Sequence, residues 1–318
     1  MLPDTEVTRA LPAVGRAHAK SILIGEHSAV YGAPAIAFPV RALAVEARLA
    51  PSDAPRLATA LFRGPVSEAP RELIPVLTAW QTAERRFGAP DGPSELAIDS
   101  AVPPTRGLGS SAAVAVAVVR AAAAAAGAQP GDDLVHALAQ EAETVAHGSP
   151  SGIDARAVAA DGPVLFRGGE AAPLAVGAPF SLVIADTGVA GSTGIAVGSV
   201  ARLRAEETDA VDARIARLAD LAERAAGDLA AGDVAGLGAR MGEAHDQLSA
   251  LGVSSPELDA LVDAARAAGS PGAKLTGAGQ GGCALALASS SGDALEIAAA
   301  LRQAGATQTW MTTIGATA

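Results

Sequence analysis

The sequence is poor in cysteine and in aromatic residues. A single cysteine, Cys283, excludes an intrachain disulfide and fits a reducing compartment, so we expect a cytoplasmic protein. Aromatic residues make up only 3% of the chain, so the core must be built from Ala, Val, Leu and Ile. A chain of 318 residues can bury such a core without cross-links, and its length favours two domains.

The sequence also lacks the features that membranes and nucleic acids require. The longest apolar run, 112–126, is interrupted by Arg120 and is too short to cross a bilayer, so it predicts a buried helix. The first nine residues contain Asp4, Glu6 and Arg9 but no apolar core, so no signal peptide is predicted. With a net charge of −11 and no basic stripe, the chain would repel a polyanion. Neither nucleic acid nor a membrane is an expected partner.

Hydrophobic patterning predicts a mixture of strands and helices. Short apolar or alternating runs predict strands at 21–24, 43–49, 95–99, 182–185, 273–276, 283–288 and 307–312. Longer runs predict helices at 70–87 with a late start because of Pro75, at 110–126, 132–146 and 293–304, and almost throughout 195–268 with breaks near Gly232 and at 252–256. We place a domain boundary near residue 180.

A glycine-rich segment precedes the helix predicted at residue 110. Gly107 and Gly109 allow the backbone to approach a ligand closely, and a helix N-terminus offers unpaired N–H groups that suit phosphate. Ser110 and Ser111 can cap the helix, bind a phosphate oxygen or ligate Mg²⁺. An ordinary glycine turn with a serine N-cap is an equal alternative, and the absence of a following lysine excludes a P-loop.

A second glycine-rich segment, 274–282, matches the pattern G-x-G-x-x-G at Gly277, Gly279 and Gly282. The dinucleotide-binding fingerprint needs a helix after it, whereas 283–287 predicts a buried strand. We therefore expect a link between two strands. It is either a plain hairpin or a loop whose backbone packs closely against a nucleotide or the first glycine-rich segment.

Two carboxylates and two lysines stand beside turns. Glu143 falls in the last turn of a predicted helix, where a cation partner would relieve an unfavourable charge. The plain alternative for Glu143 is a solvated helix end. Asp154 follows a Pro-Ser-Gly turn that would aim its carboxylate into a cleft, and its plain alternative is a turn or cap aspartate. Of the 23 basic residues only Lys20 and Lys274 are lysine, which indicates sites that need a compact point charge rather than an arginine fork.

Taken in order, these segments resemble the motifs of the GHMP small-molecule kinases. The motifs are the segment 19–32, the glycine loop 107–113 and the glycine loop 274–282. The first has Ser28-Ala29 where galactokinases have Thr-Asp, and the run 147–154 also resembles the members that phosphorylate mevalonate. The resemblance spans residues 15–288, and the motifs are specific in combination rather than singly.

The resemblance implies an α+β, two-domain GHMP kinase fold. An N-terminal ribosomal-S5-domain-2-like domain, 1–180, would bind ATP, and a C-terminal ferredoxin-like α/β sandwich would occupy 181–318, with the active site in the cleft between them. It also implies an ATP- and Mg²⁺-dependent kinase that phosphorylates mevalonate directly, in isoprenoid biosynthesis, without a phosphoenzyme. Members of this family are often homodimers, and the residues leave the oligomeric state open.

The resemblance also implies roles for individual residues. The ATP phosphates would contact Pro104, Arg106, Gly107, Leu108, Gly109, Ser110, Ser111 and Ala112. Mg²⁺ would be held by Ser110 or Ser111 together with Glu143. Asp154 would accept the proton of the attacking hydroxyl, with Lys20 beside it. The substrate would contact Lys20, Glu26, His27, Asp154, Thr193, Gly277 and Ala278; Gly194 follows Thr193 where relatives commonly carry a basic residue.

Other functions remain as alternatives. Within the family they are phosphomevalonate kinase, homoserine kinase, a galactokinase-like sugar kinase and diphosphomevalonate decarboxylase. A non-catalytic ligand sensor would be expected to lose the base or the metal-binding acid, whereas Lys20, Glu143 and Asp154 are all present. A metal-binding His147 is disfavoured because no H-E-x-x-H motif accompanies it, and Cys283 lies in an apolar run typical of a core.

Overall fold

The computed structural model describes residues 11–148 and 152–315, which form two compact units. Within the described residues, the first unit contains 11–19, 43–102, 109–148 and 152–159. The second contains 20–42, 103–108 and 160–315. Because the two units interleave segments before residue 160, the domain boundary near residue 180 stays a prediction.

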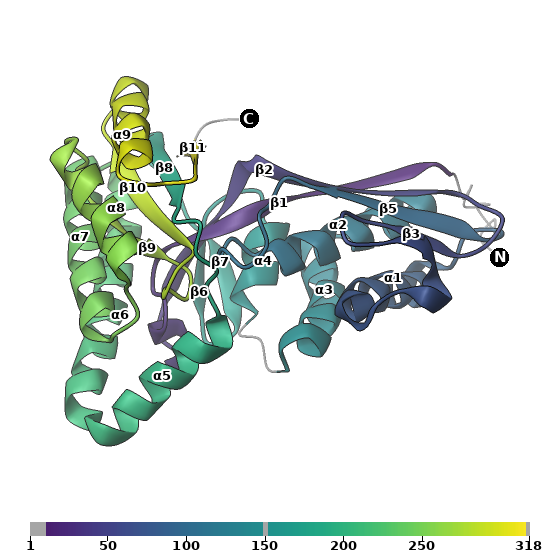
Figure 1. Ribbon diagram of the computed structural model, residues 1–318, viewed down its shortest axis with the longest axis horizontal. Coiled ribbons are helices and arrows are strands. Elements are labelled where there is room, and N and C mark those ends of the chain that lie inside the picture. Colours follow the sequence, from purple (N-terminus) through teal and green to yellow (C-terminus); the bar gives the residue numbers. More distant parts are fainter. Residues whose placement is uncertain (1–10, 149–151, 316–318) are drawn as a thin grey trace, which may run out of the picture. The chain divides into compact units, whose positions relative to one another are not determined.

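The first unit contains part of a mixed β-sheet, with helices packed against it (Figure 1). It contains the first part of β1 (Ala13–Ile24) and the second part of β2 (Ala35–Pro51), with all of β3 (Arg56–Ala58), β4 (Arg63–Pro65) and β5 (Ser94–Ser100). Strand β2 pairs antiparallel with β5, and β3 lies parallel to β5. In β2 the side chains of Val45, Ala47 and Leu49 are buried while their neighbours are more exposed, so one face of the strand packs on the core.

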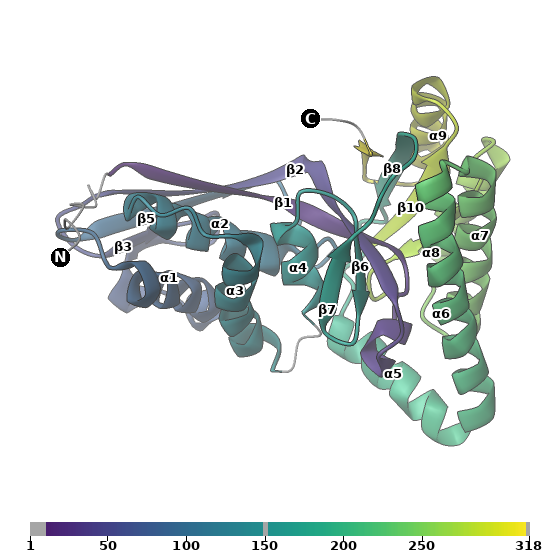
Figure 2. The ribbon, with the colours of Figure 1, turned by 180° about the vertical axis from the view of Figure 1, so that it is seen from behind.

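Helices of the first unit pack on one another beneath these strands (Figure 2). They are α1 (Ile74–Phe87), α2 (Ser110–Ala125), α3 (Asp132–His147) and α4 (Ile153–Ala159). Helix α2 is the longest apolar run of the sequence, and its small side chains are buried on most of its circumference. At Gly15 of β1, any Cβ would overlap the α2 backbone at Ala117 and Ala121, so the strand requires glycine there.

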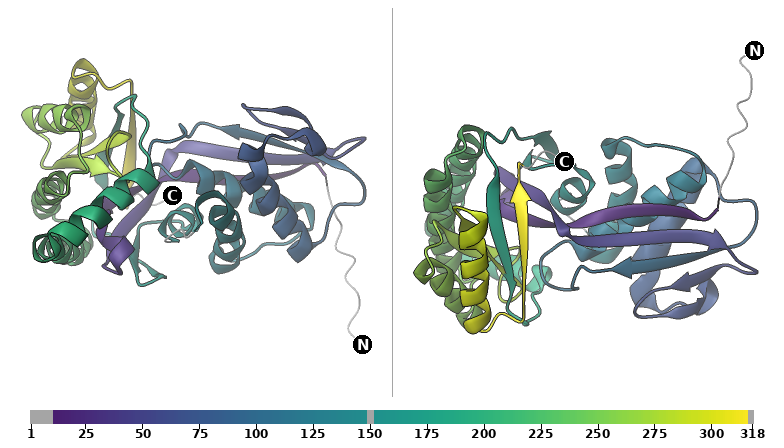
Figure 3. Two further views of the ribbon diagram at one scale, coloured as in Figure 1. Left: turned by 60° about the horizontal axis from the view of Figure 1, so that its bottom comes forward. Right: turned by 90° about the horizontal axis from the view of Figure 1, so that it is seen from above.

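The second unit is built on a four-stranded antiparallel sheet in the order β11-β8-β10-β9. The right-hand view of Figure 3 shows the yellow strand β11 beside the teal strand β8. The strands are β8 (Phe180–Asp186), β9 (Ala273–Thr276), β10 (Cys283–Ala288) and β11 (Gln308–Ile314). A further pair, β6 (Val164–Arg167) and β7 (Glu170–Pro173), continues from the start of β2. Strand β10 is buried at every residue, as expected for an apolar strand with a neighbour on both sides.

Helices α7, α8 and α9 pack on one face of this sheet, and α6 packs on α7 (Figure 1). The helices of the second unit are α5 (Thr193–Glu206), α6 (Thr208–Ala231), α7 (Val234–Ala250), α8 (Pro256–Ala267) and α9 (Ser291–Gln303). Short 3₁₀ helices are η1 (Ser28–Tyr31), η2 (Val66–Glu68) and η3 (Arg71–Leu73). Among the described residues, every helix is too short or too polar to span a lipid bilayer.

Much of the predicted secondary structure is confirmed. Strands β9 and β10 have the predicted bounds, and α1 begins at Ile74, beside Pro75, as the late start required. Because β10 follows the second glycine-rich segment, the dinucleotide fingerprint is excluded there. The structure also corrects the prediction. Strand β1 begins at Ala13 rather than Ser21, β2 begins at Ala35 rather than Leu43, and the long helical stretch has a further break at Glu207. Strands β3, β4, β6 and β7 were not predicted, and Asp154 lies in a short helix, α4.

Candidate active site

The first glycine-rich loop enters helix α2 through glycines in the left-handed region. Gly107 has φ 74° and Gly109 has φ 70°. Gly109 is the N-cap of α2, and its carbonyl accepts a hydrogen bond from Ala113 N at 2.9 Å, so the alternative of a serine N-cap is wrong. The first backbone N–H groups of α2, at Ser110 and Ser111, have no carbonyl partner inside the helix and are available to an anion.

Two residues predicted to contact ATP have side chains in the core. Leu108 is buried and so is Ala112, which faces into the packing of α2. These residues can therefore offer a ligand only their backbone, which is the part that a phosphate-binding loop uses. Pro104 stands in the same loop, where Thr105 adopts φ 58°, an uncommon conformation for a β-branched residue.

Ser111 and Glu143 meet within the first unit. Ser111 Oγ donates a hydrogen bond to Glu143 Oε1 at 2.5 Å, between helices α2 and α3. Glu143 is buried. A carboxylate and a hydroxyl suit Mg²⁺, which usually keeps several waters and binds one or two carboxylates plus substrate phosphates. Among the described residues no three His, Cys, Asp or Glu side chains gather as a metal site, so phosphate oxygens would have to complete the coordination. The donor set therefore fits the predicted Mg²⁺.

Asp154 is the second residue of α4. Gly152 precedes the helix with φ 83°, and Ile153 and Ala155 on either side of Asp154 are buried. These neighbours fix the backbone of the helix start against the core. A carboxylate in the first turn of a helix also interacts favourably with the helix dipole. The preceding residues 149–151 of the motif lie outside the described part of the chain.

In the second unit, Lys20 lies against the first glycine-rich loop. Its backbone N–H donates to Leu108 O at 3.0 Å, and its Nζ donates to Gly107 O, also at 3.0 Å. Lys20 is 2% exposed. Strand β1 therefore delivers a buried positive charge to the carbonyl of the loop that was predicted to bind phosphate.

The second glycine-rich loop, between β9 and β10, packs its backbone against neighbouring loops. A Cβ added at Gly277 would lie 3.0 Å from Gly107 Cα, and one at Gly282 would lie 2.9 Å from Arg106 O. A Cβ at Gly279 would overlap Val253 O. All three glycines have positive φ. The segment links a hairpin, because β9 and β10 pair antiparallel from Thr276 and Cys283 onward. Its loop also packs closely against the first glycine-rich loop, as the second alternative required.

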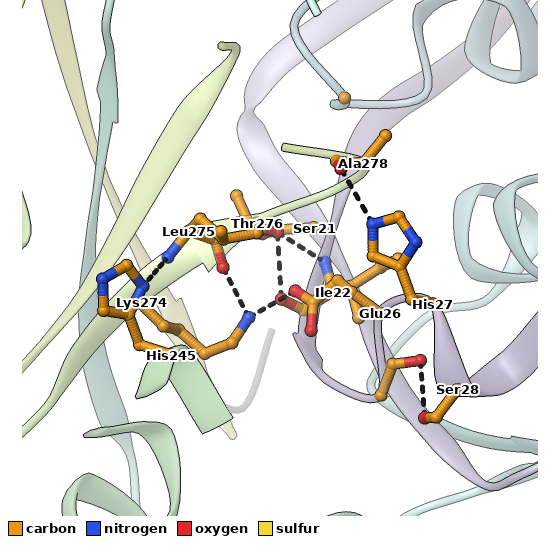
Figure 4. Close-up of polar contacts among 12 residues, drawn as sticks. Ser21, Ile22, Glu26, His27, Ser28, His245, Lys274, Leu275, Thr276 and Ala278 are labelled. Carbon is orange, nitrogen blue, oxygen red and sulfur yellow. Dashed lines mark hydrogen bonds and ion pairs between the residues drawn. The ribbon is translucent and has the colours of Figure 1, made fainter. Parts of the chain in front are cut away.

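His27 and Thr276 join the N-terminal motif to the second glycine-rich loop (Figure 4). His27 Nε2 donates to Ala278 O at 2.8 Å. Thr276 Oγ1 donates to Ile22 O at 3.0 Å and accepts from Ile22 N, which leaves Ser21 Oγ as its second donor. Burial lowers the pKa of His27, so the ring is neutral with its proton on Nε2, and Nδ1 is an acceptor. No sequence feature indicated that Thr276 would make these contacts.

Glu26 and Lys274 form an ion pair that is fully buried (Figure 4). Lys274 Nζ donates to Glu26 Oε1 and to Leu275 O. Burial raises the pKa of Glu26 and lowers the pKa of Lys274, and the attraction between the two charges opposes both shifts. Glu26 was predicted from the motif, whereas this pairing of Lys274 was not; the scarcity of lysine was its only signal.

Arg106 joins the first glycine-rich loop to the residues after β8. Its Nε lies 2.8 Å from Asp186 Oδ1, and its Nη2 donates to Gly188 O at 3.1 Å. Asp186 Oδ1 in turn accepts from Gly188 N at 2.8 Å. The guanidinium predicted to contact ATP is therefore engaged in a clamp between two loops. Asp186 had no functional signal in the sequence.

Thr193, predicted to contact substrate, is the first residue of α5 and is exposed. The loop before it is tied to the first glycine-rich loop, because Gly191 N donates to Thr105 O at 3.0 Å. In the second unit, hydrogen bonds thus join Lys20 to the first glycine-rich loop, that loop to the segment before Thr193, and His27 to Ala278.

Comparison with known proteins places these features in a family. The model described as "GHMP kinases N terminal domain" matches residues 75–162, and "GHMP kinases C terminal" matches 225–307. The mevalonate kinase of Aeropyrum pernix is 36% identical over 275 residues, which cover 82% of this chain and 84% of the relative. The mevalonate kinase of Thermococcus gammatolerans is 34% identical over 319 residues, which cover 92% and 93%.

A solved structure gives the same result. The mevalonate kinase of L. major, crystallised in complex with R-mevalonate, is 28% identical and matches with a TM-score of 0.82 over 99% of this chain and 98% of its own. This likeness confirms the predicted α+β, two-domain kinase fold. The kinases of this family use ATP as the phosphate donor. Because both family domains match and the relatives are covered over most of their length, the chain belongs to the GHMP kinase family and groups with its mevalonate kinases.

Proposed function

We propose that this chain is a mevalonate kinase, which transfers the γ-phosphoryl group of ATP to the 5-hydroxyl of (R)-mevalonate in isoprenoid biosynthesis. The observation that carries the proposal is the buried ammonium of Lys20 on the carbonyl of Gly107, in a loop that opens helix α2. Relatives named mevalonate kinase, at up to 36% identity, support the choice of acceptor.

Phosphoryl transfer depends mainly on positioning and on the neutralisation of charge. The backbone N–H groups at the start of α2 would hold phosphate oxygens, and the glycines at 107 and 109 would let the chain approach them. The ammonium of Lys20 would stabilise negative charge on the oxygens of the transferring group. None of these roles requires a covalent intermediate on the protein.

In the proposed reaction, the 5-oxygen of mevalonate attacks the γ-phosphorus in line with the leaving group. The new O–P bond forms as the bond between the γ-phosphorus and the β,γ-bridging oxygen breaks, and ADP leaves with that electron pair. Asp154 accepts the proton of the hydroxyl and later releases it to solvent. Asp154→Asn should abolish turnover while leaving ATP binding within about twofold, and preserved turnover in this variant would rule out the assignment.

Ser111 and Glu143, with Ser110 beside them, are the proposed protein ligands of Mg²⁺. The bound ion would neutralise charge on the β- and γ-phosphates. Glu143→Gln should weaken binding of Mn²⁺, used as a spectroscopic probe, by at least about tenfold in the presence of ADP. Unchanged Mn²⁺ binding would remove Glu143 from the metal site.

On the acceptor side, Glu26, His27, Thr193, Gly277 and Ala278 are proposed to contact mevalonate with Lys20. The neutral His27 ring offers Nδ1 as an acceptor, and Glu26 offers Oε2, a buried atom without a hydrogen-bond partner among the described residues. Both atoms suit the hydroxyl groups of mevalonate.

Purified protein incubated with Mg²⁺, ATP and one acceptor at a time tests the function. We expect ADP release and mevalonate 5-phosphate, seen by mass spectrometry, with mevalonate, and at most a hundredth of that rate with phosphomevalonate, homoserine or galactose. Turnover of phosphomevalonate alone would favour phosphomevalonate kinase instead.

A cytoplasmic location and a homodimer complete the proposal, and light scattering on purified protein tests the assembly.

A further inference from the structure

The two lysines of the sequence act on the same carboxylate. Lys274 forms the buried ion pair with Glu26, and Lys20 also lowers the pKa of Glu26 through its charge. Lys274 is 0% exposed and Glu26 is 2% exposed. All other basic residues except the histidines are arginine. A chain that otherwise uses arginine thus keeps its only lysines around Glu26.

The buried pair needs a reason beyond folding stability. Removing two charges from water is costly, and well-packed apolar side chains usually replace a buried ion pair with little loss or some gain of stability. The ammonium is held by Glu26 Oε1 and by Leu275 O, so it has little freedom to move. It therefore fixes the Glu26 carboxylate in one orientation.

The second oxygen of that carboxylate is the informative atom. Glu26 Oε2 is buried and has no hydrogen-bond partner among the described residues. An acceptor left unsatisfied inside a protein is unfavourable unless a ligand supplies a donor. The next residue in the chain, His27, donates a hydrogen bond to Ala278 O, so the orientation of its ring is fixed as well.

We infer that Lys274 is a positioning residue for the acceptor alcohol: its ammonium holds Glu26 Oε1 so that Oε2 is presented, as an anionic acceptor, to a hydroxyl group of the substrate. The inference rests on the proposed function, because it assigns the substrate hydroxyl to mevalonate. Lys274 itself does not touch the substrate. Burial, which raises the pKa of Glu26, makes the adjacent positive charge necessary for the ionised form.

Three variants test the inference: Lys274→Met, Glu26→Gln and the two combined. Lys274→Met should raise the KM for mevalonate at least about tenfold and leave the KM for ATP within about twofold. The double variant should match Glu26→Gln in its mevalonate KM, because Lys274 has no role once the carboxylate is gone. Arg217→Met, which removes an ion pair with Glu243 elsewhere in the second unit, is the control and should change neither constant.

The pH dependence separates positioning from mere structural damage. In Lys274→Met the carboxyl of Glu26 stays buried without its partner, so its pKa rises further and mevalonate affinity should increase as the pH is raised above 7. The unaltered protein, in which the charge of Lys274 opposes this shift, should show a smaller increase. Lys20 is the other charge that acts on Glu26, and the pKa values of His27 and His245 are lowered from 6.5, so neither imidazole titrates above pH 7.

Turnover of mevalonate by the unaltered chain decides the function, and the comparison among variants decides the inference. If the double variant binds mevalonate more weakly than Glu26→Gln, or if the loss in Lys274→Met is independent of pH, the inference is overturned. This comparison between the double variant and Glu26→Gln stands even if Lys274→Met alone does not fold. Calorimetric titration with mevalonate in the absence of ATP gives the binding constants.

Discussion

The ammonium of Lys20 donates a hydrogen bond to the carbonyl oxygen of Gly107 at 3.0 Å, from a position that is 2% exposed. This contact links the start of the N-terminal motif to the loop before helix α2. It places the positive charge of Lys20 beside the loop backbone that a phosphate would approach. Removal of that charge should therefore affect catalysis more than folding.

Lys20→Met should lower kcat by about 10²- to 10³-fold, because a charge that stabilises the transferring group is lost. The KM for mevalonate should rise less than kcat falls. Lys20→Arg should not restore the rate, since a planar guanidinium cannot occupy the place of a compact ammonium. Steady-state kinetics check this, with thermal unfolding to establish that each variant is folded. A Lys20→Met variant within about fivefold of the original kcat would contradict the role.

The close approach of the two glycine-rich loops predicts a steric effect at Gly277. Gly277→Ala adds a Cβ that would lie 3.0 Å from Gly107 Cα, at a residue with φ 81°. We expect a loss of about 1–3 kcal/mol in the free energy of unfolding, measured with denaturant, together with a higher KM for ATP.

Gly252→Ala is the matched control for this prediction. Gly252 has φ 74°, but a Cβ there would meet no atom within 4 Å. It should therefore show the backbone strain alone, with a normal KM for ATP. Equal effects of the two substitutions would mean that the contact between the loops is unimportant.

The Arg106–Asp186 clamp predicts that Arg106 acts mainly through Asp186. Arg106→Ala and Asp186→Asn should each lower Tm, because each leaves a partly buried charge or carbonyl without its partner. The double variant should be no less stable than the worse single variant. If Arg106 also bound a phosphate through its side chain, Arg106→Ala would raise the KM for ATP far more than Asp186→Asn does, which is the measurement to make.

His245 predicts a loss of stability in mild acid. Its Nδ1 accepts a hydrogen bond from Leu275 N at 3.3 Å, and its Nε2 lies 3.3 Å from Asp259. Burial lowers its pKa from 6.5, with the charge of Lys274 adding to the effect. The unfolded chain therefore takes up this proton at a higher pH than the folded chain does. The histidine's contribution to stability is complete above about pH 6.5 and declines as the pH falls below that value.

His245→Asn keeps an acceptor near the position of Nδ1 but cannot be protonated. The fall in Tm between pH 7 and pH 5 should be smaller in this variant than in the unaltered protein. Asp246, Asp259 and Arg266 also act on His245, and all three remain in both proteins, so the difference isolates the imidazole. Parallel Tm curves would show that His245 does not titrate in this range.

Local sequence was enough to predict the strands β9 and β10 and the helix α2. Short apolar runs bounded by turn residues favour buried strands, and a long apolar run favours a buried helix. The sequence also identified the glycine loops and the order of the motifs. It did not reveal the full length of β1, because residues before Ser21 alternate small and polar side chains whose burial depends on α2. It missed α4 as well, since a helix of this length is stabilised by packing rather than by its own residues.

The sequence by itself determined the chemistry available to this protein: glycines that admit a phosphate, two lysines, and carboxylates at Glu26, Glu143 and Asp154. Only the tertiary structure decided which of these groups work together. The pairing of Glu26 with Lys274 joins residues that are far apart in the chain, and it depends on β9 lying beside the end of β1. Such contacts form when the strands that carry these residues are buried against each other. Local sequence patterns do not specify which distant strands pack together.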